Sequence, residues 1–303
     1  MTAIEKTVNS CQCVVVEGLD NFDINKIFDC GQCFRFDRVE HSVHEKEFSG
    51  VAYGKFVSFA QDGQTLFIYG SSVEEYMNIW KKYLDIDRDY DAVVADIAYH
   101  CDNSALSCAI EYGRGIRILS QDPFECVISF IISQNNNIPR IKKIIEALCQ
   151  KCGEPIEISE ELQRHANPRT SLCAFPTPQA IYGLGVDGLF ELKTGFRAKY
   201  IYDAVEKIIS GTLSFENVLQ SDDTETAIDM LCDVKGIGRK VASCALLFGF
   251  EKYDAFPIDV WMKKVALKYF GAKGGELSAK DFGSYAGIAQ QYLFYYERYN
   301  SQK

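Results

Sequence analysis

The chain has 303 residues, 47% hydrophobic and 24% charged, which is typical of a folded globular protein and excludes a disordered one. Its formal net charge of −10 opposes nonspecific binding to nucleic acids, although a local basic face stays compatible with that total. There is no run of roughly 18 apolar residues and no signal-peptide pattern, so we expect a soluble intracellular protein with no membrane partner. Its compartment would be the cytoplasm or nucleoid of a prokaryote, or a eukaryotic nucleus.

The first hundred residues are predicted to form mainly β-strands. Two alternating runs flank Asp62-Gly63, which is a strong hairpin signal. From Val73 onward the apolar period changes to about 3.6, which predicts amphipathic helices. The predicted strands cover residues 11–18, 34–39, 47–54 and two runs within 55–70, and the first two predicted helices cover 73–84 and 91–100.

Residues 120–153 are predicted to form two helices. Asp122 is a good N-cap, with Pro123 at the first helical position and Glu125 at the capping-box position. This first helix is apolar nearly all round, so we expect it to be buried, and Pro139 begins the second helix after a run of asparagines. Further helices are predicted at residues 197–210, 223–234, 239–250, 259–270 and 284–299.

This order of elements predicts an α+β fold. We expect an antiparallel β-rich N-terminal domain over residues 1–118 and a larger, mainly helical domain over residues 119–303. The chain shows no internal repeat and no low-complexity linker.

Twelve cysteines are most simply explained as buried thiols in a reducing compartment. The alternative is structural zinc, because two CxxC spacings occur, at Cys30–Cys33 and Cys149–Cys152. More than a hundred residues separate these pairs, and the second pair falls in a helical pattern, which weakens that alternative. No cysteine follows Cys244, which excludes a C-terminal iron–sulfur cluster.

The segment DVKGIGRKVASC, residues 233–244, has two glycines around one apolar residue, followed by a basic pair. Its spacing is wrong for a P-loop, and a helix rather than a strand precedes it, which argues against a dinucleotide site. The pattern is helix, tight turn, helix, and the free N–H groups at the start of the second helix suit a nucleic-acid phosphate. A plain αα-hairpin that uses glycine for its turn is the alternative.

Lys240 lies in the first turn of that second helix, on the unfavourable side of the helix dipole. It could be a solvated lysine, a phosphate contact, or a nucleophile whose pKa the dipole and Arg239 lower. Asp259 follows Pro257 and opens another helix, where an N-cap is its simplest role. The intervening chain is long enough to return and place Asp259 beside Lys240.

The segment DVKGIGRKVASCALLF, residues 233–248, is followed by DAFPIDVWMKK, residues 254–264. Together they resemble the helix-hairpin-helix DNA glycosylase superfamily, in which such a lysine and aspartate mark a bifunctional member. Four other stretches resemble the eukaryotic-type 8-oxoguanine DNA glycosylases. They are CGQCFRF (30–36), QDPFECVISFIISQNNNIPRI (121–141), GFRAKY (195–200) and AGIAQQYLF (286–294). The resemblance runs in order from about residue 11 to the C-terminus, and implies a β-rich glycosylase domain followed by a helix-hairpin-helix glycosylase domain.

The resemblance implies base excision from double-stranded DNA that contains 8-oxoguanine, by a monomer that needs no cofactor. Lys240 would attack C1′ of the flipped nucleotide, expel the base and form a Schiff base that permits β-elimination. Asp259 would position Lys240 and stabilise charge on the sugar. The base pocket would use the Gly31 carbonyl for the N7–H of the lesion, Gln290 for its Watson–Crick edge, Phe294 and Cys244 as a sandwich, and Pro257.

The same resemblance implies a DNA-binding face. Asn135 would fill the gap left by the flipped base, Arg140 and Arg197 would contact the orphaned cytosine, and Phe196 would wedge beside it. The N–H groups of Gly236 and Gly238 would hold phosphate, with Trp261 nearby. A monovalent or calcium ion could bind the backbone carbonyls of Cys232, Val234 and Ile237.

Three positions depart from the family pattern: Trp261 stands where a histidine is usual, Phe196 where tyrosine is common, and Lys235 where proline is usual. None removes a group that the chemistry needs, but Lys235 would loosen the turn or add a phosphate contact. The rival hypotheses are a glycosylase for another damaged base, a helix-hairpin-helix protein that binds DNA without cutting it, and a thiol-based metal or redox protein.

Overall fold

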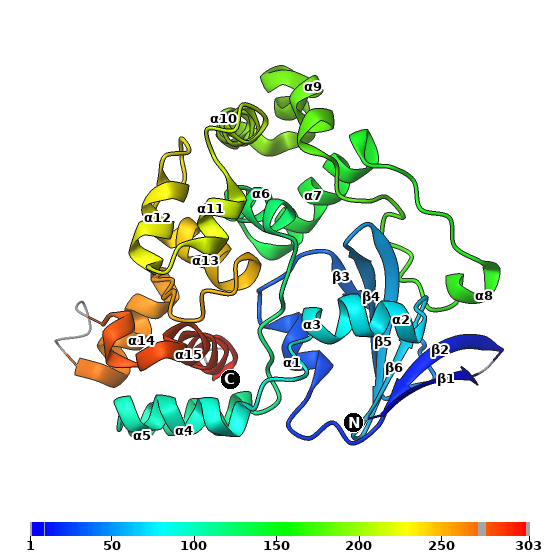
Figure 1. Ribbon diagram of the computed structural model, residues 1–303, viewed down its shortest axis with the longest axis horizontal. Coiled ribbons are helices and arrows are strands. Elements are labelled where there is room, and N and C mark those ends of the chain that lie inside the picture. Colours follow the sequence, from blue (N-terminus) through cyan, green and yellow to red (C-terminus); the bar gives the residue numbers. More distant parts are fainter. Residues whose placement is uncertain (1, 9, 272–276, 301–303) are drawn as a thin grey trace.

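The computed structural model describes residues 2–8, 10–271 and 277–300. One antiparallel sheet of six strands, in the order β1-β2-β6-β5-β4-β3, is followed along the chain by an array of helices (Figure 1). This confirms the predicted α+β class. The strands are β1 (Ala3–Val8), β2 (Cys11–Val16), β3 (Phe36–Arg38), β4 (Lys46–Ala52), β5 (Lys55–Asp62) and β6 (Thr65–Tyr69).

The predicted strands are confirmed, and the hairpin at Gly63 pairs Asp62 with Thr65. Strand β1, helix α1 and the helices Ser104–Gly113, Glu160–Gln163, Pro178–Leu189 and Phe215–Gln220 were missed. Strand β1 is an edge strand with mostly exposed residues, so it lacks the apolar alternation that marks a strand. Helix α1 (Ile24–Asp29) has only six residues, capped by Asp23, and such a short segment has little periodicity to detect.

The helical part of the chain contains every helix that the sequence predicted, with bounds shifted by a few residues. The main helices are α2 (Val73–Glu75), α3 (Lys81–Tyr83), α4 (Tyr90–His100), α5 (Ser104–Gly113), α6 (Pro123–Ser133), α7 (Ile138–Cys152), α8 (Glu160–Gln163), α9 (Pro178–Leu189), α10 (Ala198–Ile209), α11 (Phe215–Gln220), α12 (Thr224–Cys232), α13 (Arg239–Gly249), α14 (Val260–Phe270) and α15 (Ala286–Asn300). A π-helical turn, Tyr76–Trp80, joins α2 to α3.

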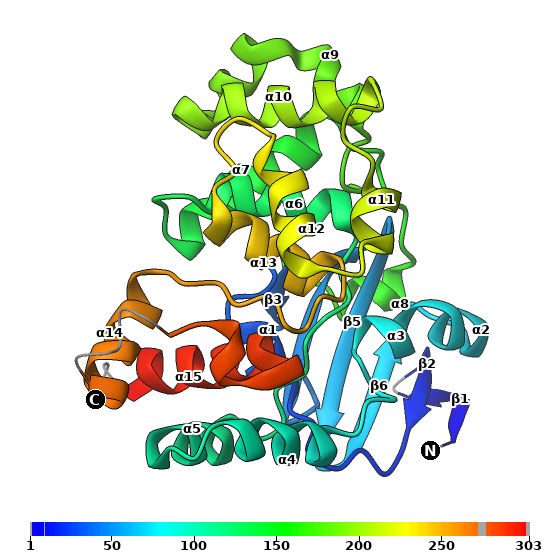
Figure 2. The same cartoon turned by 60° about the vertical axis from the view of Figure 1, so that its left-hand side comes forward.

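Two hydrophobic cores divide the molecule. One face of the sheet packs against α1 and the α2–α3 segment, with Phe59 stacked on Phe28 and edge-on to Trp80. The helices from α4 onward share the other core, except α8, whose Leu162 packs against a small third cluster on the sheet; α4, α5 and α15 lie together in both views (Figures 1 and 2). Helices α4 and α5 therefore belong to the helical core although they precede residue 118. The domain ranges 1–118 and 119–303 stay a prediction.

The chain between α7 and α9 returns to the second face of the sheet. His165 lies flat on Tyr69, with ring centroids 3.6 Å apart, and its Nδ1 is 2.7 Å from a carboxylate oxygen of Glu47. Ser58 also donates to Glu47, so this buried carboxylate is fully engaged. The contact fastens the helical part of the chain to the sheet.

The cysteine pairs that could have supplied zinc ligands do not assemble. Throughout the described part of the chain, no group of three or more His, Cys, Asp or Glu side chains is arranged to hold a metal. All twelve thiols are free, and most are buried. Nor is any described helix both long and apolar enough to cross a bilayer.

A buried ion cluster joins the sheet domain to α6 and α7. Arg35 is 3% exposed, and its guanidinium lies 3.8 Å from Glu125 and 3.9 Å from Glu146. These distances are too long for hydrogen bonds, and the Glu125 side chain is only 14% exposed. Burial raises the pKa of Glu125 to about 7, despite the opposing attraction of Arg35.

We predict that Glu125→Gln stabilises the protein in a pH-dependent way. Because the folded-state pKa is raised, the stability that the protonated Glu125 contributes is complete below pH 4.5 and is lost as the pH rises through about 7. The free energy of unfolding of the variant should therefore gain about 1–3 kcal/mol on wild type between pH 4.5 and 8. Denaturant unfolding at several pH values measures this, with the exposed Glu154→Gln as control. Parallel pH profiles for wild type and Glu125→Gln would contradict it.

Candidate active site and DNA interface

The glycine-rich segment forms the turn of a helical hairpin between α12 and α13. The Val234 carbonyl accepts a hydrogen bond of 3.0 Å from the Ile237 amide, and Gly236 has a φ of 82°. This is a type II turn, which requires positive φ at its third residue. Gly238 is the N-cap of α13 and supplies no side chain to cap it, so the first N–H groups of α13 remain available to a ligand.

Lys240 lies in the first turn of α13, and Cys244 lies one turn later on the same helix. Burial raises the pKa of the Cys244 thiol, Lys240 lowers it and Asp259 raises it, so both charged groups are within electrostatic reach of this thiol. The Lys240 ammonium is also 5.7 Å from the centroid of the Phe130 ring on α6. Lys240 and Cys244 thus share one face of α13, and Lys240 also lies near the Phe130 ring, while the predicted contact of Lys240 with Asp259 stays a prediction.

Asp259 is the N-cap of α14, as its simplest interpretation predicted. Its Oδ1 accepts hydrogen bonds from the amides of Trp261 (2.9 Å) and Met262 (2.8 Å). These two bonds fix the orientation of the carboxylate. No described residue donates to Oδ2, so one oxygen of a half-buried carboxylate is available for chemistry.

Helix α15 fastens the loop that carries Gly31. Gln291 donates to the Cys30 carbonyl at 2.7 Å, and Arg298 donates to the Asp29 carbonyl at 3.1 Å. Gly31 has a φ of 82°, and a Cβ placed on it would lie 3.7 Å from the Phe294 ring. Two predicted pocket residues that are 263 positions apart are therefore in contact distance. The Gly31 carbonyl accepts no hydrogen bond from the residues described.

Gln290 is 5% exposed, and its amide makes no hydrogen bond with any described group. Its amide atoms are not among the fully enclosed polar atoms that lack a partner, so they are accessible to the polar edge of a ligand. One turn before it, Gly287 lets α15 approach α13 closely, because a Cβ there would lie 2.6 Å from Leu247. Gln290 thus lies near the α13–α15 crossing. The sandwich between Cys244 and Phe294 and the part played by buried Pro257 stay predictions.

The turn between α6 and α7 carries Asn135 in a left-handed conformation, with a φ of 47°. Arg197 is 4% exposed and donates to the carbonyls of Gln134 (2.8 Å), Asn135 (3.1 Å) and Thr194 (3.1 Å). Its guanidinium therefore supports the asparagine turn here. Its predicted contact with a cytosine stays a prediction.

Arg140 and Phe196 lie at the surface beside this turn. Burial lowers the pKa of Arg197, and the like charge of Arg140 lowers it further. Phe196 is 51% exposed and lies beneath the Arg197 guanidinium, 4.5 Å from ring centroid to carbon. An exposed aromatic ring beside a strained turn is suited to insertion between bases.

The backbone carbonyls at the hairpin turn suit the predicted cation. No described group donates to the carbonyls of Cys232 and Ile237, whereas the Val234 carbonyl accepts from the Ile237 amide. Carbonyl oxygens without donors are ligands that hard cations prefer. On α14, Trp261 is half-buried, and the Lys264 ammonium lies 4.6 Å from its ring centroid.

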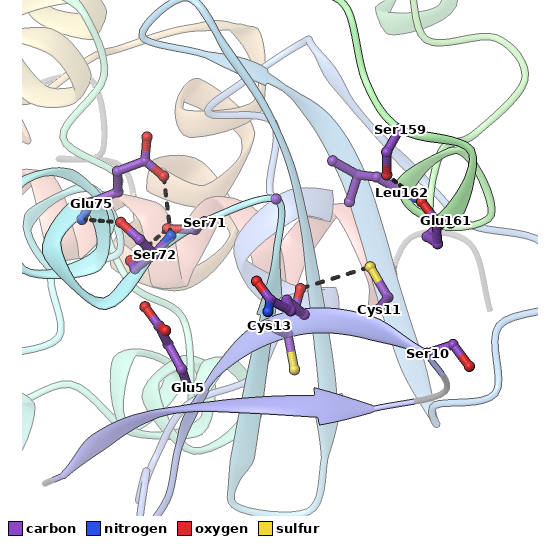
Figure 3. A pocket seen from close by; sticks show the side chains of 12 residues that line it. Glu5, Ser10, Cys11, Cys13, Ser71, Ser72, Glu75, Ser159, Glu161 and Leu162 are labelled. Carbon is purple, nitrogen blue, oxygen red and sulfur yellow. Dashed lines mark hydrogen bonds between the residues drawn. The ribbon is translucent and has the colours of Figure 1, made fainter.

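One cavity lies beside Lys240, and another lies beside the β1–β2 hairpin. One of about 280 Å³ opens beside Lys240 and is also lined by Ser243, Asp254 and Phe256. Another of about 420 Å³ lies between the β1–β2 hairpin, α2 and α8 and contains none of the predicted site residues (Figure 3). Its carboxylates serve the fold, since Glu5 accepts from the Val73 amide and Glu75 forms a capping box with Ser72.

Sequence reasoning missed the support beneath the hairpin turn. The Tyr200 ring packs against Gly236, where a Cβ would lie 2.2 Å from the ring. Asp203 and Lys207, on the same helix, bond to the turn's backbone. Their spacing of three and four residues on α10 was a readable signal, but nothing in the sequence indicated which segment that face would contact.

Family models match most of the chain. Residues 128–282 match the HhH-GPD superfamily of base excision DNA repair proteins, and residues 14–127 match the N-terminal domain of 8-oxoguanine DNA glycosylase. The chain therefore belongs to the HhH-GPD superfamily.

Within that superfamily the chain belongs with the 8-oxoguanine glycosylase/lyases. The Clostridium acetobutylicum 8-oxoguanine glycosylase/lyase, solved with double-stranded DNA containing cytosine opposite 8-oxoguanine, is 36% identical, with a TM-score of 0.88 and 99% of each chain covered. A probable N-glycosylase/DNA lyase of Methanothermobacter thermautotrophicus is 27% identical over 68% of this chain and 70% of its own length. The Saccharomyces cerevisiae N-glycosylase/DNA lyase is 30% identical over 60% of this chain, which spans only 56% of that protein.

Gly236→Ala is predicted to destabilise the hairpin. The new Cβ would meet the Tyr200 ring and force an unfavourable positive φ on alanine, so the free energy of unfolding should fall by about 1–3 kcal/mol. Gly238→Ala is the matched control, because nothing lies within 4 Å of a Cβ there and its φ of −97° suits any residue. Thermal or denaturant unfolding measures both. Equal losses in the two variants would refute this account of the turn.

Proposed function

We propose that this protein is a bifunctional DNA glycosylase/lyase that removes 8-oxoguanine, preferably opposite cytosine, and then nicks the strand by β-elimination. The observation that carries the proposal is Lys240 in the uncapped first turn of α13, one turn before Cys244 and beside the cavity that Phe256 also lines. The approach of Phe294, in the middle of α15, to Gly31 supports a base pocket between them.

The proposed chemistry begins at Lys240. Its neutral amine attacks C1′ of the flipped nucleotide, and the electron pair of the bond between C1′ and the base leaves with the base, which takes up a proton. Loss of the remaining amine proton and opening of the sugar give a Schiff base. Removal of a C2′ proton then expels the 3′ phosphate. The free Oδ2 of Asp259 stabilises the positive charge that develops on the sugar and assists proton transfer.

Lesion recognition would rest on hydrogen-bond polarity. Oxidation at C8 makes N7 a donor, whereas N7 of guanine is an acceptor. A carbonyl at Gly31 with no other donor would bond to the lesion and would face guanine with two opposed acceptors, which costs more than a missing contact. The partnerless amide of Gln290 would bind the Watson–Crick edge, and Phe294 and Cys244 would enclose the ring.

The duplex would be held by three features of the same face. The N–H groups near Gly236 and Gly238 would bind a phosphate, with the ion at the hairpin carbonyls adding positive charge when bound. Asn135 would fill the space of the flipped base. Arg140 would reach the orphaned cytosine, and Phe196 would wedge beside it.

Lys240→Gln is predicted to abolish covalent trapping. Wild type, incubated with borohydride and a duplex carrying 8-oxoguanine opposite cytosine, should give a protein–DNA adduct, because reduction fixes the Schiff base. The variant should give none and should lose at least 1,000-fold in base release, while it still binds the duplex. Lys252→Gln, which alters a lysine remote from α13's first turn, is the control.

The outcomes separate the hypotheses. An unchanged adduct in Lys240→Gln would reject this nucleophile. Binding without base release or adduct in wild type would favour a DNA-binding protein, and release of another damaged base instead would favour a different glycosylase. Equal rates with all four opposite bases would refute the cytosine preference.

Gln290→Ala should separate base recognition from strand cleavage. Loss of the amide removes hydrogen bonds to the lesion but touches neither Lys240 nor Asp259. We expect 8-oxoguanine release to fall by 10- to 100-fold, while nicking of a preformed abasic site stays within about threefold of wild type. Gel assays on the two substrates measure this. An equal fall on both would place Gln290 outside the base pocket.

A further inference from the structure

One face of α10 carries three side chains that contact the hairpin turn. Tyr200, Asp203 and Lys207 are spaced by three and four residues, so they share that face. Helix α10 lies beside the loop between α12 and α13 in both views (Figures 1 and 2). The Tyr200 ring covers Gly236, and the Lys207 ammonium donates to the carbonyl of Asp233.

Asp203 makes the central contact of this face. Its side chain is 9% exposed, and its Oδ2 accepts a 2.9 Å hydrogen bond from the backbone amide of Lys235. Lys207 pairs with the same oxygen at 3.2 Å, and the Lys235 ammonium pairs with Oδ1 at 3.3 Å. A buried carboxylate with two cations and one amide donor is well compensated.

The Lys235 amide is free for this bond because of the turn's geometry. Lys235 is the second residue of the type II turn from Val234 to Ile237, a position whose N–H takes no part in the turn and which favours proline. Proline fixes φ near −65° without any partner. Lysine has no such constraint, so an external acceptor has to hold the position.

We propose that Asp203 is a positioning residue for DNA binding, and that its carboxylate holds the turn in the shape that presents the α13 N–H groups to phosphate. This inference rests on the proposed function. Asp203 substitutes for the rigidity that proline would give at residue 235. Because α13 begins two residues after Ile237, the same contact sets the direction in which Lys240 projects.

The test is a double-mutant cycle between residues 203 and 235. Asp203→Ala should weaken binding to a duplex with an uncleavable abasic-site analogue about tenfold and slow borohydride trapping. In Asp203→Ala/Lys235→Pro, proline restores the φ constraint, so affinity should return to within about threefold of wild type. Asp203→Ala/Lys235→Ala removes the same lysine charge without that constraint and should not recover. Asp203→Asn keeps an acceptor and should fall between wild type and Asp203→Ala.

A merely structural Asp203 would give a different pattern. Affinity that recovers with neither second substitution, or equally with both, would overturn the proposal. Amide hydrogen exchange needs no DNA and separates this failure from failure of the proposed function. The Lys235 and Ile237 amides should exchange at least tenfold faster in Asp203→Ala, and unchanged exchange would overturn the proposal even if wild type binds the duplex.

Discussion

The candidate active face depends on how α10 holds two turns that have no rigidity of their own. Arg197, at its N-terminal end, uses its guanidinium on the carbonyls of the Asn135 turn. Asp203, farther along, takes the amide of the hairpin turn. Both turns contain a residue with positive φ, a conformation that costs free energy for Asn135 but not for Gly236. Charge-assisted hydrogen bonds from one helix offset the cost at Asn135 and hold both turns against that helix.

The second constraint joins the Gly31 loop to helix α15, far away in the sequence. The loop with Gly31 follows a helix of only six residues, which could not hold a defined shape alone. Helix α15 holds it with Gln291 and Arg298, and near its start Gly287 lies against Leu247 of α13. The helix that would support lesion recognition therefore contacts the helix that carries the proposed nucleophile. A shift of α15 would move the Gly31 carbonyl and Phe294 together, which preserves their mutual geometry.

Much of this could be predicted from the sequence, for physical reasons. Asp122, Pro123 and the asparagine run mark helix ends by local chemistry, so α6 and α7 were found with nearly correct bounds. Gly236 was found because a turn that tight needs positive φ. The exposed strand β1 and the short helix α1 left no such local mark.

The contacts that were missed are all long-range. Arg197 could be singled out as an arginine beside a candidate DNA contact, but only the fold shows that its donors bond to the carbonyls of residues 63 and 62 positions earlier in the chain. Asp203 is similar: an aspartate in an amphipathic helix is ordinarily solvated, and its burial against Lys235 follows from the angle between α10 and the hairpin. Sequence periodicity predicts which residues share a face, whereas the partner of that face depends on packing.

A net charge of −10 raises the question of how the protein would hold a polyanion. Near the hairpin the side-chain charges largely cancel, since Arg239 pairs with Glu225 and Asp229 while Lys207 and Lys235 pair with Asp203. Lys240 forms no ion pair with a described residue, and the backbone adds the uncapped N–H groups at the start of α13 and the positive end of its dipole. Such dipoles act only at short range and with fixed direction, unlike a diffuse basic patch. Phosphate binding at this turn would therefore depend on the shape of its backbone, and a carboxylate that repels phosphate as a charge would still favour binding as a support.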